Sequence, residues 1–230
     1  MILNNVDYFN QNNVFTPDFP SLRVRVENAF NDTTQKVVNF VRSPEGQIVI
    51  GFGLGLVLST VTRPLTSRVV TALGLPAASS SFGEPKIPPL IILAILAYLA
   101  PRICITGPIT AENLFRETLQ PSLIHDLQRR FFSLGLPDSI ASVAARVTAV
   151  VLTSIAFAAI HIPMVAIHAL LGNPVGACSL VVNAFCMGVI LGLAKELTGE
   201  LYMSKAMHIT NNTKVWAENV WGCLYSIARG

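Results

Sequence analysis

The stretch PLIILAILAYLAP, residues 89–101, contains no charged side chain and is the first indication of the fold class. Two other windows, residues 47–62 and 147–194, also contain no Asp, Glu, Lys or Arg. A helix that crosses a membrane needs about 20 predominantly apolar residues, so the longest window is sufficient for two crossings. These windows predict an all-helical, polytopic membrane bundle.

The composition of the 230-residue chain agrees with this prediction. Hydrophobic residues make up 52% of the chain and charged residues 13%, and the mean hydropathy is +0.55. A soluble domain usually has about 25% charged residues. The net charge of +3 is scattered and forms no basic stripe, which argues against a nucleic-acid partner and favours loops that contact anionic lipid headgroups.

Two regions are expected from the distribution of apolar residues. Residues 1–43 are predicted to form a polar tail followed by an amphipathic interfacial helix over 21–42, in which apolar side chains recur at near-helical spacing. The sequence Ser-Pro-Glu at 43–45 predicts a helix start, because it offers an N-cap, a proline at the first position and an acid in the first turn. Residues 44–230 are then predicted to form a multi-pass membrane domain.

The breaks between helices are predicted from prolines, glycines and charges. Gly107-Pro108 predicts a break, and the proline-rich region 62–89 predicts a long connection with a short helix over 66–75. Another short helix is expected from Pro163 to about Gly172. The longer expected helices cover residues 44–61, 88–105, 110–130, 139–161 and 176–197, and a last pair of helices covers roughly 200–229. Gly51 and Gly55, four residues apart, would allow close helix contact, although ordinary tolerance of glycine in a membrane helix is an equally good reading.

A small set of polar residues falls within or beside these apolar helices. Ionisable groups at membrane depth cost at least about 2.5–3.5 kcal/mol, so they are candidates for a functional site. Glu112 and Arg116 are four residues apart and can pair on one helix face. His208 and Asn212 are also four residues apart, and His161 ends another span. A single such pair is usually a structural salt bridge, and a single histidine is usually a packing residue. Their coincidence on three helices favours a site.

The chemistry of this set suits the activation of water. A carboxylate in a low-dielectric pocket can take a proton from water, while imidazoles and an asparagine amide can orient that water and stabilise an oxyanion. Alternatively, Glu112, His161 and His208 could hold zinc and leave a position for water. The chain lacks HExxH and each ligand would come from a different helix, so direct carboxylate catalysis without a cofactor is preferred.

Three short motifs give the chain a resemblance to a known family. The sequences AENLFR (111–116), FAAIH (157–161) and HITNN (208–212) resemble the EExxxR, FxxxH and HxxxN motifs of the CPBP intramembrane proteases, which include CaaX prenyl endopeptidases and bacteriocin-processing relatives. The resemblance covers about residues 88–215. It implies a helical membrane fold with a conical catalytic cavity open to lipid and to the cytosolic side. The substrate it implies is a membrane protein or a lipidated or leader peptide.

By this resemblance, the first glutamate of EExxxR is the general base, the acid and arginine that follow support the site, and the two histidines and the asparagine position the water. This chain has Ala111 at the position of the base. Alanine has no proton acceptor, and Glu112 points about 100° away around the helix, so it does not substitute. Two explanations are open: a deliberate replacement that traps an inactive protein, favoured because the other motif residues are intact, and a natural pseudoprotease.

The sequence therefore predicts an intramembrane endopeptidase, inactive as written, that hydrolyses a peptide bond with activated water. The alternative is a non-catalytic scaffold or chaperone that binds the transmembrane helices of a partner. A small transporter is disfavoured because no repeated halves are visible. Arg129 and Arg130 indicate a cytosolic flank, but the pairs Arg63 with Arg68 and Arg23 with Arg25 lie on segments that could face opposite sides, so the topology stays open.

Overall fold

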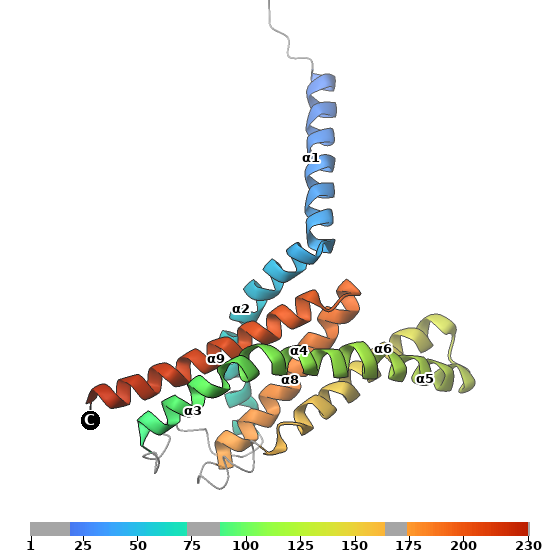
Figure 1. Cartoon of the computed structure of the whole chain (residues 1–230). Helices are drawn as coiled ribbons and strands as arrows, with labels where there is room; N and C mark the ends of the chain where they lie inside the picture. The colour runs from blue at the N-terminus through green and yellow to red at the C-terminus, as the bar shows by residue number, and fades with distance from the viewer. Residues whose placement is uncertain (1–18, 73–87, 164–173, 230) are drawn as a thin grey trace, which may run out of the picture. The chain divides into compact units, whose positions relative to one another are not determined.

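The computed structural model describes residues 19–72, 88–163 and 174–229, and every regular element in these ranges is a helix (Figure 1). The all-helical prediction is therefore confirmed for the described part of the chain. The chain divides into two compact units, Met1–Val41 and Arg42–Gly230. The roles predicted for residues 1–43 and 44–230 remain predictions.

Helix α1, Phe19–Arg42, forms where the sequence predicted an amphipathic helix. Its apolar side chains Val26, Phe30 and Val37 are exposed, and Lys36 pairs with Asp32 one turn away at 2.7 Å. A helix with this pattern needs a second apolar surface or a membrane interface to cover it. Its placement at the membrane interface remains a prediction.

Helix α2, Pro44–Ala72, begins where the sequence predicted a helix start. The Ser43 hydroxyl accepts a hydrogen bond from the Gly46 N–H at 3.0 Å, which is the N-cap contact. The predicted end near residue 61 is wrong, because the helix continues through Pro64 to Ala72, about three turns further. In an apolar surrounding the backbone has no water to bond with, so a helix is retained across a proline that would end it in water.

The opening stretch belongs to one continuous helix that runs from Leu90 to Ser133. The predicted break at Gly107-Pro108 is wrong. Two turns of π-helix, with hydrogen bonds to the carbonyl five residues back, replace it: the Gly107 N–H donates to the Arg102 carbonyl, and the Gln120 N–H donates to the Phe115 carbonyl. The segments in order are α3 (Pro89–Pro101), η1 (Arg102–Thr106), α4 (Gly107–Glu112), η2 (Asn113–Leu119) and α5 (Gln120–Ser133).

The C-terminal half contains α6 (Asp138–Ala159), α8 (Pro174–Thr198) and α9 (Tyr202–Arg229). The first two match their predicted spans closely. Helix α9 is a single helix, so the predicted last pair is wrong. The turn before it contains Gly199 at a φ of 77°, a conformation that glycine adopts without strain. The predicted short helix from Pro163 to Gly172 lies almost entirely outside the described residues.

Four helices are long and apolar enough to cross a membrane, counted over the described ranges alone. The predicted polytopic character is thus supported by length and composition. The four windows are Pro44–Val61, Leu90–Ser133, Asp138–Ala159 and Ser179–Thr198.

Helix α9 lies at the centre of the packing that positions the site. It packs against α2, α3, α4 and α8. Met203 and Met207 of α9 are buried with Met187 and Leu191 of α8, and Ile50 and Leu58 of α2 cover this cluster. The three helices α2, α8 and α9 therefore share one apolar core.

The glycines of α2 provide the close contact with α9. A Cβ at Gly51 would lie 2.7 Å from the Met203 carbonyl oxygen, and one at Gly55 would lie 2.8 Å from the Met207 carbonyl oxygen. A Cβ at Gly53 would meet nothing within 4 Å. The close-contact reading of Gly51 and Gly55 is therefore confirmed.

Candidate active site

The centre of the candidate site is a buried pair between Glu112, the last residue of α4, and His208 of α9. The His208 Nδ1 and the Glu112 Oε1 are 3.1 Å apart, although the two residues are 96 positions apart in the sequence. Glu112 is fully buried and His208 is 6% exposed. The second carboxylate oxygen, Oε2, is buried and has no hydrogen-bond partner among the described residues. The carboxylate therefore retains an acceptor for a further donor.

Phe157 of α6 brings the two motif histidines to the same place. Its ring lies 5.2 Å from the His161 ring and 5.3 Å from the His208 ring, centroid to centroid. On another side it meets Phe115 edge-on, with the centroids 5.7 Å apart. The His161 Nδ1 is 2.9 Å from the Phe157 carbonyl oxygen, so with Nδ1 protonated the ring donates this bond. That bond leaves the Nε2 of His161 for other partners.

Ala111 belongs to the same neighbourhood. It is half-buried and packs against the cluster formed by Phe115, Phe157, Ala158 and Ala184. A longer side chain at this position would extend from α4 beside the aromatic ring that contacts both histidines. Position 111 therefore adjoins the aromatic cluster that contains Phe157.

Arg116 does not form the predicted ion pair with Glu112 in the described part of the chain. Its Nη1 donates to the Gln120 Oε1 at 3.0 Å and to the Thr153 Oγ1 at 2.6 Å, and its Nη2 donates to the Gly188 carbonyl at 2.5 Å. These acceptors lie on α5, α6 and α8. The guanidinium has one acceptor on its own continuous helix and two on the neighbouring helices α6 and α8, while Glu112 pairs with His208. This different choice of partners explains why the predicted pair does not form.

The side chain of Asn212 is engaged by the backbone of the opening helix. Its Nδ2 donates to the Ile103 carbonyl at 3.0 Å. In a regular helix that carbonyl would accept from Gly107, but the Gly107 N–H donates to Arg102, and the next residue, Pro108, has no N–H. Asn212 thus satisfies a carbonyl that the π turn and the proline release. Its predicted oxyanion role remains a prediction.

The zinc alternative finds no geometric support. Across residues 19–72, 88–163 and 174–229, no three or more His, Cys, Asp and Glu side chains gather closely enough to hold a metal ion. Glu112 and His208 are adjacent, but His161 does not complete a ligand set with them. Among the side chains that the structure describes, the donors required for a structural or catalytic zinc site do not converge.

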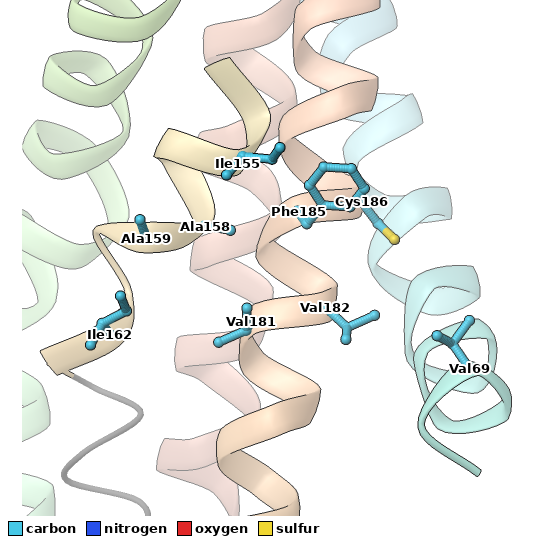
Figure 2. A pocket seen from close by; sticks show the side chains of 9 residues that line it. All are labelled: Val69, Ile155, Ala158, Ala159, Ile162, Val181, Val182, Phe185 and Cys186. Carbon is cyan, nitrogen blue, oxygen red and sulfur yellow. The ribbon is translucent and has the colours of Figure 1, made fainter. Parts of the chain in front are cut away.

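An apolar pocket of about 640 Å³ adjoins the site. Figure 2 shows the side chains that line it. Three of its residues, Ala158, Val181 and Phe185, also belong to the cluster that surrounds Ala111 or pack against it. Ligand pockets typically have volumes of about 300–1,000 Å³. No charged side chain lines this one, and its wall consists of Val69, Ile155, Ala158, Ala159, Ile162, Val181, Val182, Phe185 and Cys186.

Sequence reasoning missed the residues that hold Arg116. Gln120 and Thr153 are fully buried, and both bind the guanidinium. A signal for Gln120 was present, since it lies four residues after Arg116 on the same helix. Thr153 lies within an apolar span, where a threonine hydroxyl usually bonds its own helix backbone, so nothing in the sequence distinguished it.

The comparison with known families assigns the chain. The fold and the site describe an all-helical, multi-pass membrane protein with a buried acid–histidine pair. The model of the type II CAAX prenyl endopeptidase Rce1-like family matches residues 91–213, slightly more than half of the chain, and the chain belongs to this family. No curated protein and no solved structure matches it significantly. Membership implies an intramembrane peptidase, and the matched region contains Ala111, Glu112, Arg116, His161, His208 and Asn212.

Proposed function

We propose that the chain is an intramembrane endopeptidase scaffold that lacks its general base because Ala111 occupies that position. The observation that carries the proposal is the convergence of α4, α6 and α9. This convergence places Ala111 in the cluster that contains Phe157, whose ring contacts His161 and His208. A glutamate at 111 would bring a proton acceptor to the two imidazoles that could hold a water molecule. Without it, the remaining groups can orient water but cannot deprotonate it efficiently.

Each remaining group has a role consistent with its contacts. Glu112 holds the ring of His208 through Nδ1, which fixes the tautomer and directs Nε2 toward a bound water or an oxyanion. His161 is oriented in the same way by the Phe157 carbonyl. Because the site is buried, each hydrogen bond to developing charge would be stronger than in water.

The test is to replace Ala111 with glutamate and to assay cleavage in liposomes. The substrates are a farnesylated peptide ending in a CaaX sequence, its unprenylated counterpart and a hydrophobic leader peptide. We expect Ala111→Glu to cleave at least one of them at a rate at least about 10²-fold above the unchanged chain, since a positioned base contributes about 10²–10⁴-fold. Ala111→Gln, which has the same shape without a base, is the matched control and should remain inactive.

A folded Ala111→Glu protein that cleaves none of these substrates would contradict the proposal. It would favour the second candidate, a scaffold that binds transmembrane segments without cleaving them. The observation in favour of that candidate is Ala111 itself, since a protein that only binds its partner needs no base. In that case the unchanged chain and Ala111→Glu should bind a transmembrane peptide equally and neither should hydrolyse it.

We propose that the apolar pocket beside the site receives the lipid chain of the substrate. The walls of the pocket suit an isoprenoid, since they present no charge and no buried polar donor that would need a partner. The residues shared with the Ala111 cluster would place the reacting peptide close to the motif residues. The name of the family, which refers to prenyl endopeptidases, supports the same substrate class.

Cys186 in the wall of the pocket provides the measurement. With the other three cysteines replaced by serine, the modification of Cys186 by N-ethylmaleimide reports access to the pocket. We expect a farnesylated peptide to slow this modification several-fold, while the unprenylated peptide of the same sequence has no effect. Equal rates of Cys186 modification with both peptides would show that the lipid chain does not occupy this pocket.

A further inference from the structure

A line of polar contacts connects the surface to the buried arginine of the site. The Arg146 Nη1 donates to the Glu196 Oε2 at 2.6 Å, and the Gln120 Nε2 donates to the other oxygen of the same carboxylate at 2.8 Å. The Gln120 Oε1 accepts from the Arg116 Nη1 at 3.0 Å. We call Arg146, Glu196 and Gln120 the relay. It runs from a side chain that is 54% exposed to a guanidinium that is fully buried.

The carboxylate of Glu196 fixes the direction of the Gln120 amide. An ionised carboxylate only accepts hydrogen bonds, so the NH2 group of Gln120 must face Glu196 and its oxygen must face Arg116. Arg146 in turn holds the carboxylate from the exposed side. If Glu196 were lost, the Gln120 amide would keep only its two longer contacts, to the Gly192 carbonyl at 3.4 Å and from the Thr153 hydroxyl at 3.5 Å. The amide would then be held less firmly in the orientation that presents its oxygen to Arg116.

The backbone of α8 leaves room for this arrangement at one glycine. A Cβ at Gly192 would lie 3.0 Å from the Arg116 Nη1 and 3.3 Å from the Gln120 Oε1. The Gly192 carbonyl also accepts from the Gln120 Nε2, at 3.4 Å. Any larger residue would push against the guanidinium and the amide, so the glycine provides the space in which the two groups meet.

Glu112 and Arg116 have complementary unpaired atoms. The Glu112 Oε2 and the Arg116 Nε are buried, and neither has a hydrogen-bond partner within the described ranges. The residues are one helical turn apart, the spacing at which an acid and an arginine normally pair. A buried pair of this kind would form readily if the guanidinium were released, because it would satisfy both atoms.

We infer that Gln120, Glu196 and Arg146 are positioning residues that hold the guanidinium of Arg116 away from Glu112, so that Glu112 pairs with His208. Cutting the relay would leave the Thr153 hydroxyl and the Gly188 carbonyl as the acceptors of the guanidinium. Arg116 could then turn its unpaired Nε toward Glu112, and His208 would lose the partner that orients it. The inference rests on the proposed function for the use of the Glu112–His208 pair, but the way in which the pair is held can be tested without activity.

The experiment observes His208 directly in the full chain reconstituted in nanodiscs. The histidines are labelled with ¹⁵N, and His208 is assigned by the signal that disappears in His208→Gln. In the unchanged chain we expect a ring Nδ1–H signal shifted downfield by its hydrogen bond to Glu112. In Glu196→Ala we expect this signal to be lost or to move upfield by more than its linewidth.

Two further variants separate positioning from general damage. Glu200→Ala removes an acid that is exposed beyond the end of α8 and lies outside the relay, so the His208 signal should not move. The double variant Glu196→Ala with Arg116→Met removes the competing cation, so the downfield signal should return. Circular dichroism and the elution volume confirm in each case that the protein is folded.

Two results would overturn the inference. One is an unchanged His208 signal in folded Glu196→Ala. The other is a lost signal that does not return in the folded double variant, because the relay would then act through general loosening of the helices.

If Ala111→Glu is active, adding Glu196→Ala should lower kcat several-fold and leave KM nearly unchanged. Equal kcat values in Ala111→Glu with and without Glu196→Ala would also overturn the inference. An inactive Ala111→Glu would count against the proposed function alone, and the His208 signal would still decide this inference.

Discussion

The most informative single contact is the hydrogen bond from Asn212 to the Ile103 carbonyl. Pro108 removes an N–H from the opening helix, and the π turn before it directs the Gly107 N–H to Arg102. A carbonyl left without a donor inside a membrane protein has no water to bond with. Asn212 therefore links α9, which contains His208, to the helix that contains Glu112.

We predict that Asn212→Ala lowers the free energy of unfolding by about 1–3 kcal/mol, the cost of a carbonyl left without a donor in an apolar, lipid surrounding. The loss should be smaller when Pro108→Ala is also present, because an alanine N–H lets the helix satisfy its own carbonyls. Unfolding titrations in mixed micelles of dodecyl maltoside and SDS would measure all four members of this double-mutant cycle.

Asn219 is the matched control for this cycle. It is on the same helix, but its amide donates to the Val215 carbonyl of its own α9 and it is exposed. Asn219→Ala should change the stability by less than about 0.5 kcal/mol, as is usual for a surface substitution. If Asn212→Ala costs the same with and without Pro108, the link between the amide and the π turn is wrong.

At the scale of single residues, the sequence could predict which residues belong to the candidate site, but it could predict their contacts less well. The three motifs named Glu112, His161 and His208, and the structure brings Glu112 next to His208 and both rings next to Phe157. The partners of Arg116 could not be predicted, because they come from α6 and α8, and the position of those helices depends on packing across the whole bundle. A spacing of four residues shows that a pair can form, but not that it prevails over other acceptors.

At the scale of the helices, the contact between α2 and α9 helps to fix the position of His208 in the structure. Gly51 and Gly55 face the backbone of α9 at Met203 and Met207, the second of which is adjacent to His208. In lipid there is little hydrophobic drive between helices, so close packing of small residues provides much of the association. The distance between these two backbones is therefore a property on which the site depends.

We predict that Gly51→Ala and Gly55→Ala each lower the free energy of unfolding by about 1–3 kcal/mol, because the added methyl would overlap backbone atoms that cannot move aside easily. Gly53→Ala is the matched control on the opposite face, where a Cβ meets nothing within 4 Å. Its stability should be unchanged or slightly higher. The midpoint of thermal unfolding, followed by fluorescence-detected size exclusion, is sufficient to rank the three. Equal loss in all three would show that α2 does not approach α9 through this face.

The lengths of the helices were predictable in part, for a physical reason. The predicted spans located α6, α8 and the start of α2 well, because apolar residues in sufficient number must be buried in lipid. Prolines were overweighted: Pro64 and Pro108 end helices in water, but in an apolar surrounding the backbone stays helical or widens to a π turn. The two π turns also shift the phase of the helix, and no uniform period of 3.6 residues could anticipate them.

At the scale of the whole molecule, the exposed arginines bear on the orientation in the membrane. We propose that the end of α5, where Arg129 and Arg130 are exposed, faces the cytosol. Short loops and helix ends rich in arginine remain on the cytosolic side during insertion. The candidate site would then open toward the same compartment.

Cysteine accessibility tests this orientation. In a cysteine-free background, Arg129→Cys should react with a membrane-impermeant maleimide in inside-out vesicles, and should not react in intact cells. Val147→Cys, on an exposed apolar face of α6, is the control and should be protected from both sides by lipid. Reaction of Arg129→Cys in intact cells would reverse the topology.

The uninterrupted helix from Leu90 to Ser133 has a mechanical consequence. Its 44 residues span about 66 Å at 1.5 Å per residue, roughly twice the 30 Å thickness of a hydrocarbon layer. The rod must therefore project from the bilayer or tilt within it, and Ala111 and Glu112 stand at its midpoint. A membrane of different thickness would change that tilt. The depth at which a substrate bond meets the candidate site is thus set by the lipid as well as by the protein.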